Sequence, residues 1–190
     1  LVIGNKVVME DAISFIPSNL KLNVIDSPEE AKGEYGYIDL LDLENIGIND
    51  FEYGKVNSKA GQASIDYIFK GIELAKAERI EAVVTGPIHK EAINAAGCPY
   101  AGHTEIFADK TDTENYAMML TEDNFRVIHV STHVSLKQAC EMVKTERVYQ
   151  VIKLADEAMK DLNIEDPRIA VAGLNPHAGE NGLFGNEEAE

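Results

Sequence analysis

The clearest hydrophobic pattern in the chain lies in residues 60–78, where apolar side chains recur close to the 3.6-residue period of a helix. The apolar positions are Ile65, Ile68, Phe69, Ile72, Leu74 and Ala75. Residues 89–97, 104–111, 135–143 and 145–163 predict further helices. Gly97 suits the C-terminal cap of the first of these, and Ser135 and Thr145 suit N-caps of the last two.

Segments of strand character alternate with these helices. Residues 80–85, IEAVVT, are almost continuously apolar, which is typical of a parallel strand covered on both faces. Further strands are expected at residues 22–26, 36–43, 115–120, 125–131 and 168–174, the last opened by Pro167. Such alternation predicts an α/β fold with a largely parallel central sheet.

Length and charge narrow the class of protein. A chain of 190 residues suits one large domain or two small ones. Its 17 basic and 33 acidic residues give a net charge of −16, which would repel a phosphate backbone and argues against nucleic acid as a partner. No apolar run approaches the roughly 18 residues of a membrane helix, and residues 1–10 lack the pattern of a signal peptide, so we expect a cytoplasmic protein.

The cysteines and the chain ends add two expectations. Cys98 and Cys140 lie far apart and form no metal or redox motif, so both are predicted to be buried thiols in a reducing compartment. The chain starts at Leu1, and its acidic end GNEEAE (185–190) is typical of the first turn of a helix. We therefore expect it to be a segment of a longer protein.

Polar clusters follow three of the predicted strands, at residues 85–90, 132–135 and 175–180. In open α/β sheets the ligand site lies beyond the C-terminal ends of the strands. Two clusters contain a histidine, His133 and His177. These imidazoles could supply two ligands of a catalytic metal, or each could only hydrogen-bond loop backbone, because their spacing matches no compact metal motif.

The remaining candidates have similarly open interpretations. Lys90 follows a predicted strand at the start of a helix, where it could bind an anion or a hydroxyl, or remain a solvated surface lysine. His103 and Thr104 could bind a phosphate or hydroxyl, although Thr104 could equally be an N-cap. His89 is interpreted as structural or exposed, and His129 as a histidine of the core or of a sheet face. No dinucleotide fingerprint, Walker loop, nucleophile elbow or cysteine-rich zinc motif is present.

Four strings in series are far more specific than any one of them. AGQASIDYIFKGIELA, VVTGPIHKEAINAAGCPYAGHTEIFA, STHVSL and GLNPHAGENGLFGNEE occur in this order. Together they resemble the 4-hydroxythreonine-4-phosphate dehydrogenase (PdxA) family, strongly over residues 55–190 and weakly before them. The resemblance implies a fold like that of isocitrate and isopropylmalate dehydrogenases, with two α/β domains of which this chain is a segment with an unassigned internal boundary.

The resemblance also implies an activity. Members of the family are homodimers that hold a divalent metal (zinc, magnesium or cobalt) through three histidines and oxidise a phosphorylated hydroxy acid with NAD or NADP. The resulting β-keto acid loses carbon dioxide, and in pyridoxal phosphate biosynthesis the substrate is 4-phosphooxy-L-threonine. By position, His133 and His177 match two metal ligands, His103 and Thr104 match a substrate-binding pair, and Lys90 matches the catalytic lysine of the T-x-P-x-x-K string.

The chain departs from the family pattern at both ends. A glycine-rich start is absent before Leu1, and the third metal histidine and most of the nucleotide site would lie beyond Glu190, so the segment alone is expected to be inactive. Two alternatives stay open. One is a dehydrogenase of the same family that acts on D-threonate or D-erythronate 4-phosphate. The other is a truncated, non-catalytic module that binds a metal or ligand.

Overall fold

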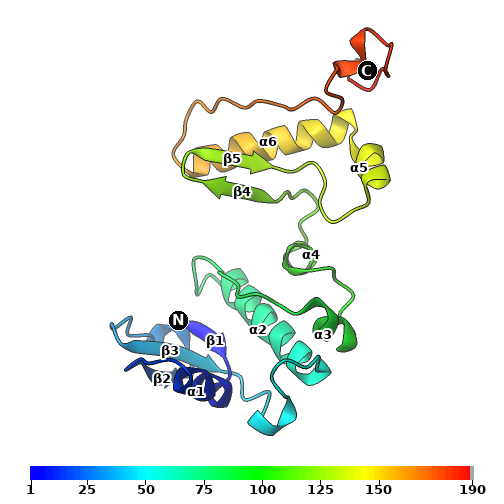
Figure 1. The fold of residues 1–190 in the computed structure, drawn as a ribbon. Helices are drawn as coiled ribbons and strands as arrows, with labels where there is room; N and C mark the ends of the chain where they lie inside the picture. The colour runs from blue at the N-terminus through cyan, green and yellow to red at the C-terminus, as the bar shows by residue number, and fades with distance from the viewer. Residues whose placement is uncertain (189–190) are drawn as a thin grey trace. The chain divides into compact units, whose positions relative to one another are not determined.

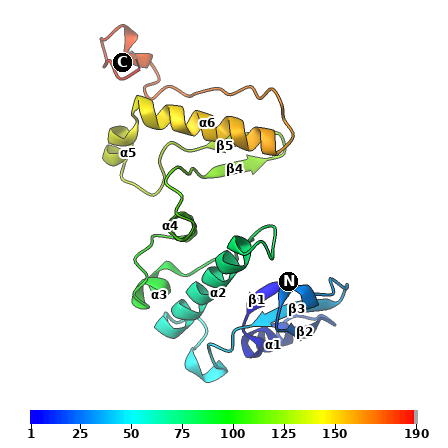
Figure 2. The same cartoon turned by 180° about the vertical axis from the view of Figure 1, so that it is seen from behind.

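The computed structural model describes residues 1–188, and the chain divides into two compact units, Leu1–Thr113 and the part from Glu114 onward (Figures 1 and 2). The helical turn expected at residues 185–190 falls partly outside the described residues. The first unit combines a small sheet with helices, and the second combines a hairpin with helices. Among residues 1–188, none of the helices combines the length and the hydropathy of a membrane-spanning segment.

The sheet of the first unit is fully parallel. It contains β1 (Val2–Gly4), β2 (Lys21–Ile25) and β3 (Tyr37–Asp42) in the order β1-β3-β2. Helix α1 (Lys6–Ser14) connects β1 to β2, and the short helices η1 (Pro28–Glu30) and η2 (Ile48–Asp50) lie in the following loops. The parallel sheet and the α/β class agree with the sequence prediction, whereas β1 and α1 were not predicted.

A buried carboxylate joins β2, β3 and the loop between them. Asp39 on β3 accepts hydrogen bonds from the Gly33 N–H at 2.9 Å, the Asn23 side-chain amide at 2.7 Å and the Lys32 N–H at 3.0 Å. These bonds, led by that from Gly33, lower the pKa of Asp39, because they favour the charged form. The carboxylate therefore holds the loop against β3, the central strand of the sheet.

A hydrophobic core of this unit lies between helices. Helix α2 (Ser58–Lys76) packs against α3 (Lys90–Ala95) and α4 (His103–Lys110) through apolar side chains. The buried residues of this core are Ile65, Ile68, Ile72, Ile93, Cys98 and Ile106. The predicted helices and the burial of Cys98 are confirmed, and Gly97 has the positive φ of +85° expected of a helix C-cap glycine.

The strand predicted at residues 80–85 is wrong for the described chain, because this segment pairs with no strand there. The Val83 side chain is half-buried near Gly71 of α2, whereas Val84 is 96% exposed. The segment is thus covered on one face only. The apolar composition favours a strand, but a strand also needs a neighbouring backbone with which to form hydrogen bonds.

The second unit contains the hairpin β4 (Met119–Glu122) and β5 (Phe125–Ile128), followed by α5 (Leu136–Met142), α6 (Thr145–Asp161) and the single turn η3 (Ala178–Glu180). The two strands are antiparallel, because the connection of two residues is too short for a parallel crossover. Val151, Ala155 and Met159 form the buried face of α6.

Three details of this unit correct the sequence predictions. Residues 168–174 form no strand in the described chain, and Ile169 and Val171 are 40% and 60% exposed. Lys144, not Thr145, is the N-cap of α6. Cys140 is exposed, because it lies on a short helix without buried residues, whereas Ser135 caps that helix as predicted, with a reciprocal bond to Gln138.

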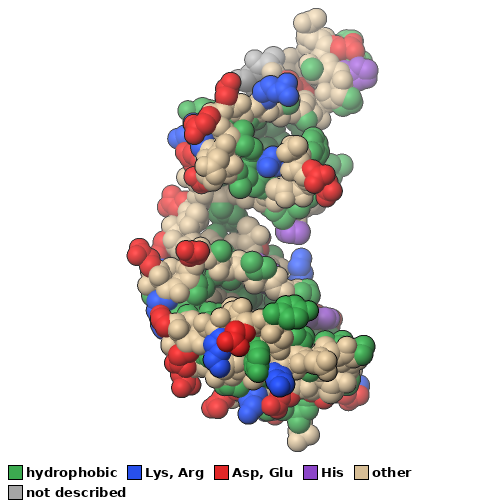
Figure 3. Space-filling model, turned by 90° about the vertical axis from the view of Figure 1, so that its left-hand side faces the viewer, with side chains coloured by type: hydrophobic (Ala, Val, Ile, Leu, Met, Phe, Trp, Pro, Cys, Tyr) green, Lys and Arg blue, Asp and Glu red, His purple; other side chains and the backbone are tan. Residues whose placement is uncertain are grey.

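Acidic side chains occur in both units on the face shown in Figure 3, as the net charge leads one to expect. Apolar side chains are exposed as well. On the hairpin, Leu120, Phe125 and Val127 are 55%, 71% and 38% exposed, and all three lie on the same side of the paired strands as Glu122.

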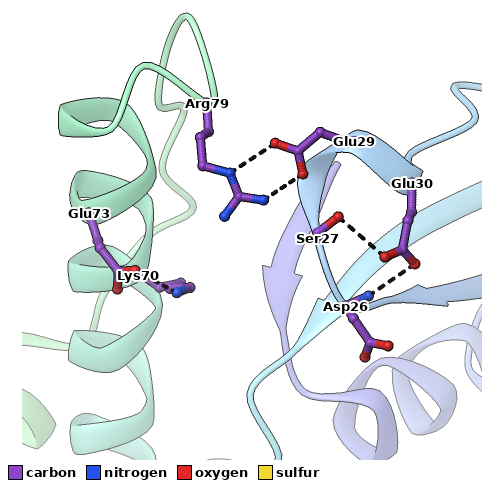
Figure 4. Close-up of polar contacts among 7 residues, drawn as sticks. All are labelled: Asp26, Ser27, Glu29, Glu30, Lys70, Glu73 and Arg79. Carbon is purple, nitrogen blue, oxygen red and sulfur yellow. Dashed lines mark hydrogen bonds and ion pairs between the residues drawn. The ribbon is translucent and has the colours of Figure 1, made fainter.

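A two-bond ion pair links η1 to the turn after α2 (Figure 4). The Arg79 guanidinium donates to both carboxylate oxygens of Glu29, at 2.8 and 2.5 Å, across 50 positions of sequence. The neighbouring contacts are local: Glu30 accepts from Ser27 and from the Asp26 N–H, and Lys70 pairs with Glu73. The bonds from Arg79, with smaller contributions from backbone N–H and Ser27, lower the pKa of Glu29 to about 2.

This ion pair predicts a stability that depends on pH. The folded-state pKa of Glu29, about 2, lies below its ordinary value of 4.5, so its contribution is present above pH 4.5 and is lost as the pH falls toward 2. In Glu29→Gln this contribution is absent. We expect the urea midpoints of wild type and variant to differ most above pH 4.5 and to converge near pH 2. A constant difference down to pH 2 would contradict the assignment.

Candidate functional site

Lys90 lies where sequence analysis placed it, at the start of a helix. It is the first residue of α3, and His89 is the N-cap, whose Nδ1 accepts a hydrogen bond from the Ala92 N–H at 3.3 Å. The structural role predicted for His89 is thereby confirmed. Lys90 is exposed and forms no ion pair within residues 1–188, so its ammonium is available to a ligand.

His103 and Thr104 occupy the first turn of α4. Gly102 is the N-cap, which excludes that role for Thr104, and its lack of a side chain leaves the first N–H groups uncapped. Burial lowers the pKa of His103, because desolvation favours the neutral imidazole over the charged form. Its Nε2 is buried without a hydrogen-bond partner in the described chain.

The turn can therefore offer backbone N–H groups and one neutral imidazole to a polar ligand. Glu105 works against an anion at the same place, because its carboxylate lies in the first turn of α4 near the N-cap. The predicted substrate-binding role of His103 and Thr104 thus has the required donors, and it stays a prediction.

His133 follows β5 in a loop that leads to the capped start of α5. It is exposed and has a φ of +57°, in the left-handed region that non-glycine residues seldom occupy. Histidine is one of the side chains enriched there, and such backbone conformations concentrate at functional sites. The geometry is compatible with an imidazole presented to a ligand.

His177 is held in a tight loop near the end of the described chain. Its N–H donates to the Asn175 side-chain oxygen at 3.0 Å, and its Nδ1 lies 2.8 Å from a carboxylate oxygen of Glu180. The imidazole is also 5.7 Å from the Phe184 ring, measured between centroids. Its side chain is 63% exposed, so the ring is fixed on one edge and open to solvent on the other.

The candidates divide between the two units. Lys90, His103 and Thr104 belong to the first, and His133 and His177 belong to the second. Within residues 1–188, no group of three or more His, Cys, Asp or Glu side chains is arranged to hold a metal ion. The imidazole nitrogens of His133 and His177 have the donor chemistry that zinc or cobalt prefers, and their binding of one ion together stays a prediction.

Two residues that contact a candidate side chain or its helix were not singled out from the sequence. Glu180 contacts His177 from three positions later, and the signal was present in the string NPHAGE. Gly61 lies against the backbone of α3, where an added Cβ would be 2.1 Å from the Ala92 carbonyl oxygen. No sequence pattern pointed to that contact, because it depends on how two helices approach each other.

Comparison with known proteins gives one coherent result. The family model described as "Pyridoxal phosphate biosynthetic protein PdxA" matches residues 1–190. A Clostridium botulinum protein named "Putative D-threonate 4-phosphate dehydrogenase" is 45% identical over 188 residues, covering 99% of this chain and 56% of the relative. A Fusobacterium nucleatum protein of the same printed name is 42% identical, with coverages of 100% and 57%.

Solved structures agree. The 4-hydroxythreonine-4-phosphate dehydrogenase of Klebsiella pneumoniae matches with a TM-score of 0.90 and 38% identity, over 100% of this chain and 57% of that structure. One from Burkholderia phymatum matches with a TM-score of 0.85 and 40% identity, over 100% and 58%. The chain therefore spans a little over half the length of the relatives it matches, and the predicted isocitrate/isopropylmalate dehydrogenase-like fold is confirmed.

Proposed function

The chain belongs to the PdxA family, and on that premise we propose that the full-length protein is a dehydrogenase that uses NAD or NADP and a divalent metal. Its substrate would be a phosphorylated four-carbon hydroxy acid. The observation that carries this proposal is the match of the family model over residues 1–190, together with the dehydrogenase names of the relatives reported above. Family resemblance also supports a cytoplasmic homodimer.

We propose D-threonate 4-phosphate as the substrate, ahead of the 4-phosphooxy-L-threonine that the sequence resemblance put first, because the curated relatives reported above carry that name. The curated relatives carrying that name are 42–45% identical to this chain, whereas the structures named for 4-hydroxythreonine-4-phosphate are 38–40% identical. The two acids share the carboxylate, the C3 hydroxyl and the terminal phosphate. They differ at C2, which carries a hydroxyl in threonate and an ammonium in 4-phosphooxy-L-threonine, so the second acid remains the alternative.

The proposed reaction has two steps. The C3 hydroxyl loses its proton, and the C3 hydride passes to the nicotinamide, which leaves a β-keto acid. The C1–C2 bond then breaks, carbon dioxide leaves, and a proton is added at C2. With the phosphorylated threonate the product is a three-carbon hydroxyketone phosphate, and with the amino acid it is the corresponding aminoketone.

The residues of this chain would contribute binding and proton transfer. His133 and His177 would hold the divalent metal together with a ligand from outside this chain, and that ion would act as a Lewis acid toward the substrate hydroxyl and carboxylate. His103, Thr104 and the first N–H groups of α4 would bind polar oxygens of the substrate. In its neutral amine form Lys90 would accept the proton of the C3 hydroxyl, and no ion pair within the described chain holds its side chain elsewhere.

Kinetics on the full-length protein test this function. We expect NADH or NADPH formation from D-threonate 4-phosphate that stops with a chelator and returns with Zn²⁺, Co²⁺ or Mg²⁺. A kcat/KM for this acid about 10²-fold above that for 4-phosphooxy-L-threonine is expected, the order of discrimination that one polar substituent supports. The reverse preference would assign the alternative substrate, and no turnover of either acid would reject the dehydrogenase.

A further inference from the structure

The carboxylate of Glu180 lies beside the imidazole of His177 in the loop that follows residue 174. One oxygen of Glu180 is 2.8 Å from Nδ1 of His177, and the Glu180 N–H also donates to the His177 carbonyl at 3.0 Å. The two residues thus close one turn, η3, through a backbone bond and a side-chain bond. Both side chains remain accessible, at 63% exposed for His177 and 49% for Glu180.

The backbone of the loop is shaped to make this contact. Ala178 and Glu180 have φ values of +47° and +42°, and Gly179 between them has +72°. Gly179 is buried, and a Cβ there would lie 2.3 Å from the Gly185 carbonyl oxygen. All five residues of 178–182 have positive φ, which is costly for the three that are not glycine unless surrounding contacts hold them.

Further bonds supply that support. The Asn175 side chain accepts from the His177 N–H at 3.0 Å and donates to the Phe184 carbonyl at 3.3 Å. The Asn175 N–H donates to Glu188 at 2.6 Å. The imidazole is consequently anchored from its own backbone, from its Nδ1 edge and from the adjacent Phe184 ring.

This contact has a chemical consequence for the neutral imidazole. A carboxylate only accepts, so Nδ1 must carry the hydrogen, and Nε2 is left with its lone pair. Nε2 has no hydrogen-bond partner among the side chains and backbone of residues 1–188. An exposed pair of this kind adds little to stability, so strengthening the fold does not explain it.

We propose that Glu180 is a positioning residue that fixes the tautomer and direction of the His177 ring, so that Nε2 is the atom offered to the divalent metal. The inference rests on the proposed metal role of His177. It assigns Glu180, which does not itself bind the metal, as the group that holds the ligand ready. Carboxylates that orient ligand histidines in this way raise metal affinity by about 10–100-fold.

Metal affinity of the full-length protein, measured by competition of Zn²⁺ with a chromogenic chelator, tests the proposal without relying on turnover. Glu180→Ala is expected to weaken Zn²⁺ binding about 10–100-fold. Glu180→Gln should retain part of the affinity, because its amide oxygen can still accept from Nδ1–H. Glu187→Gln is the matched control, because it removes one charge in the same loop at a residue without a described hydrogen bond, and its affinity should equal that of wild type.

The tautomer provides a readout that a merely structural role would not change. Long-range ¹H–¹⁵N correlation spectra of ¹⁵N-histidine-labelled, metal-free protein should show His177 with Nδ1 protonated at pH 8. In Glu180→Ala the population should move toward the Nε2–H form, while the thermal unfolding midpoint stays within about 2 °C of wild type, as expected for an exposed pair. His177→Ala identifies the signal.

The outcomes separate the two claims. If His177→Ala loses Zn²⁺ while Glu180→Ala binds it like wild type, the positioning role is overturned and the proposed function stands. If His177→Ala retains wild-type Zn²⁺ affinity, the proposed metal role of His177 fails, and the inference fails with it. An unchanged tautomer in Glu180→Ala would also overturn the positioning role, whatever the affinity shows.

Discussion

Gly61→Ala is expected to destabilise the first unit by about 3 kcal/mol, at the upper end of the cost of overpacking a core. Helix α2 approaches α3 so closely at this residue that a Cβ would lie 2.1 Å from the Ala92 carbonyl oxygen and 2.4 Å from its carbonyl carbon. The obstacle is backbone, so no rotamer change can relieve it. The helices would have to separate, which would loosen the core around Ile65 and Ile93.

Gly71→Ala is the matched control in the same helix. A Cβ there would lie 3.4 Å from Val83 Cγ1, an ordinary van der Waals contact. Both substitutions gain about 1 kcal/mol of helix propensity, so the difference between them isolates the clash. Urea unfolding followed by circular dichroism should show Gly71→Ala equal to or slightly above wild type and Gly61→Ala well below it. Equal midpoints for the two variants would show that the close approach does not exist in solution.

The contact at Gly61 also connects the fold to the candidate site. Ala92 is one turn into α3, and its N–H is capped by the imidazole of His89. Lys90 begins the same short helix, so the position of its backbone depends on how α3 lies against α2. Gly61 on α2 thereby helps to place the candidate catalytic lysine on α3.

Local patterns predicted most of the elements because their causes are local. The apolar stripe of α2, the caps at Gly97 and Ser135 and the apolar strands β2 and β3 each reflect residues close together in sequence. Residues 80–85 and 168–174 failed for the opposite reason. Their composition favours a strand, but pairing requires a neighbouring backbone, and none is available to them within the described chain.

The candidate site shows the same division. The sequence could predict that polar residues follow apolar segments, and this pattern pointed to Lys90, His133 and His177. The sequence could not predict the orientation of each side chain. That orientation depends on contacts such as the one between Glu180 and His177, or on the burial that leaves His103 Nε2 without a hydrogen-bond partner in the described chain. Residue types indicate which chemistry is available, whereas packing decides which atoms are presented.

Lys90→Met in the full-length protein is expected to lower kcat for the phosphorylated hydroxy acid about 10²–10⁴-fold, the range of a lost general acid or base. The side chain starts α3, is exposed and has no ion-pair partner within residues 1–188, so removing it costs the fold little. KM should change far less than kcat if Lys90 acts on the C3 hydroxyl proton and not in ground-state binding.

Lys90→Arg separates proton transfer from charge, because a guanidinium stays protonated and cannot accept the hydroxyl proton. We expect kcat of the arginine variant to remain near that of Lys90→Met. Lys153→Met on α6, which removes another exposed lysine without a described ion pair, should leave kcat and KM at wild-type values. Recovery of most of the activity in Lys90→Arg would show that Lys90 supplies only a positive charge, and wild-type kcat in Lys90→Met would remove it from the site.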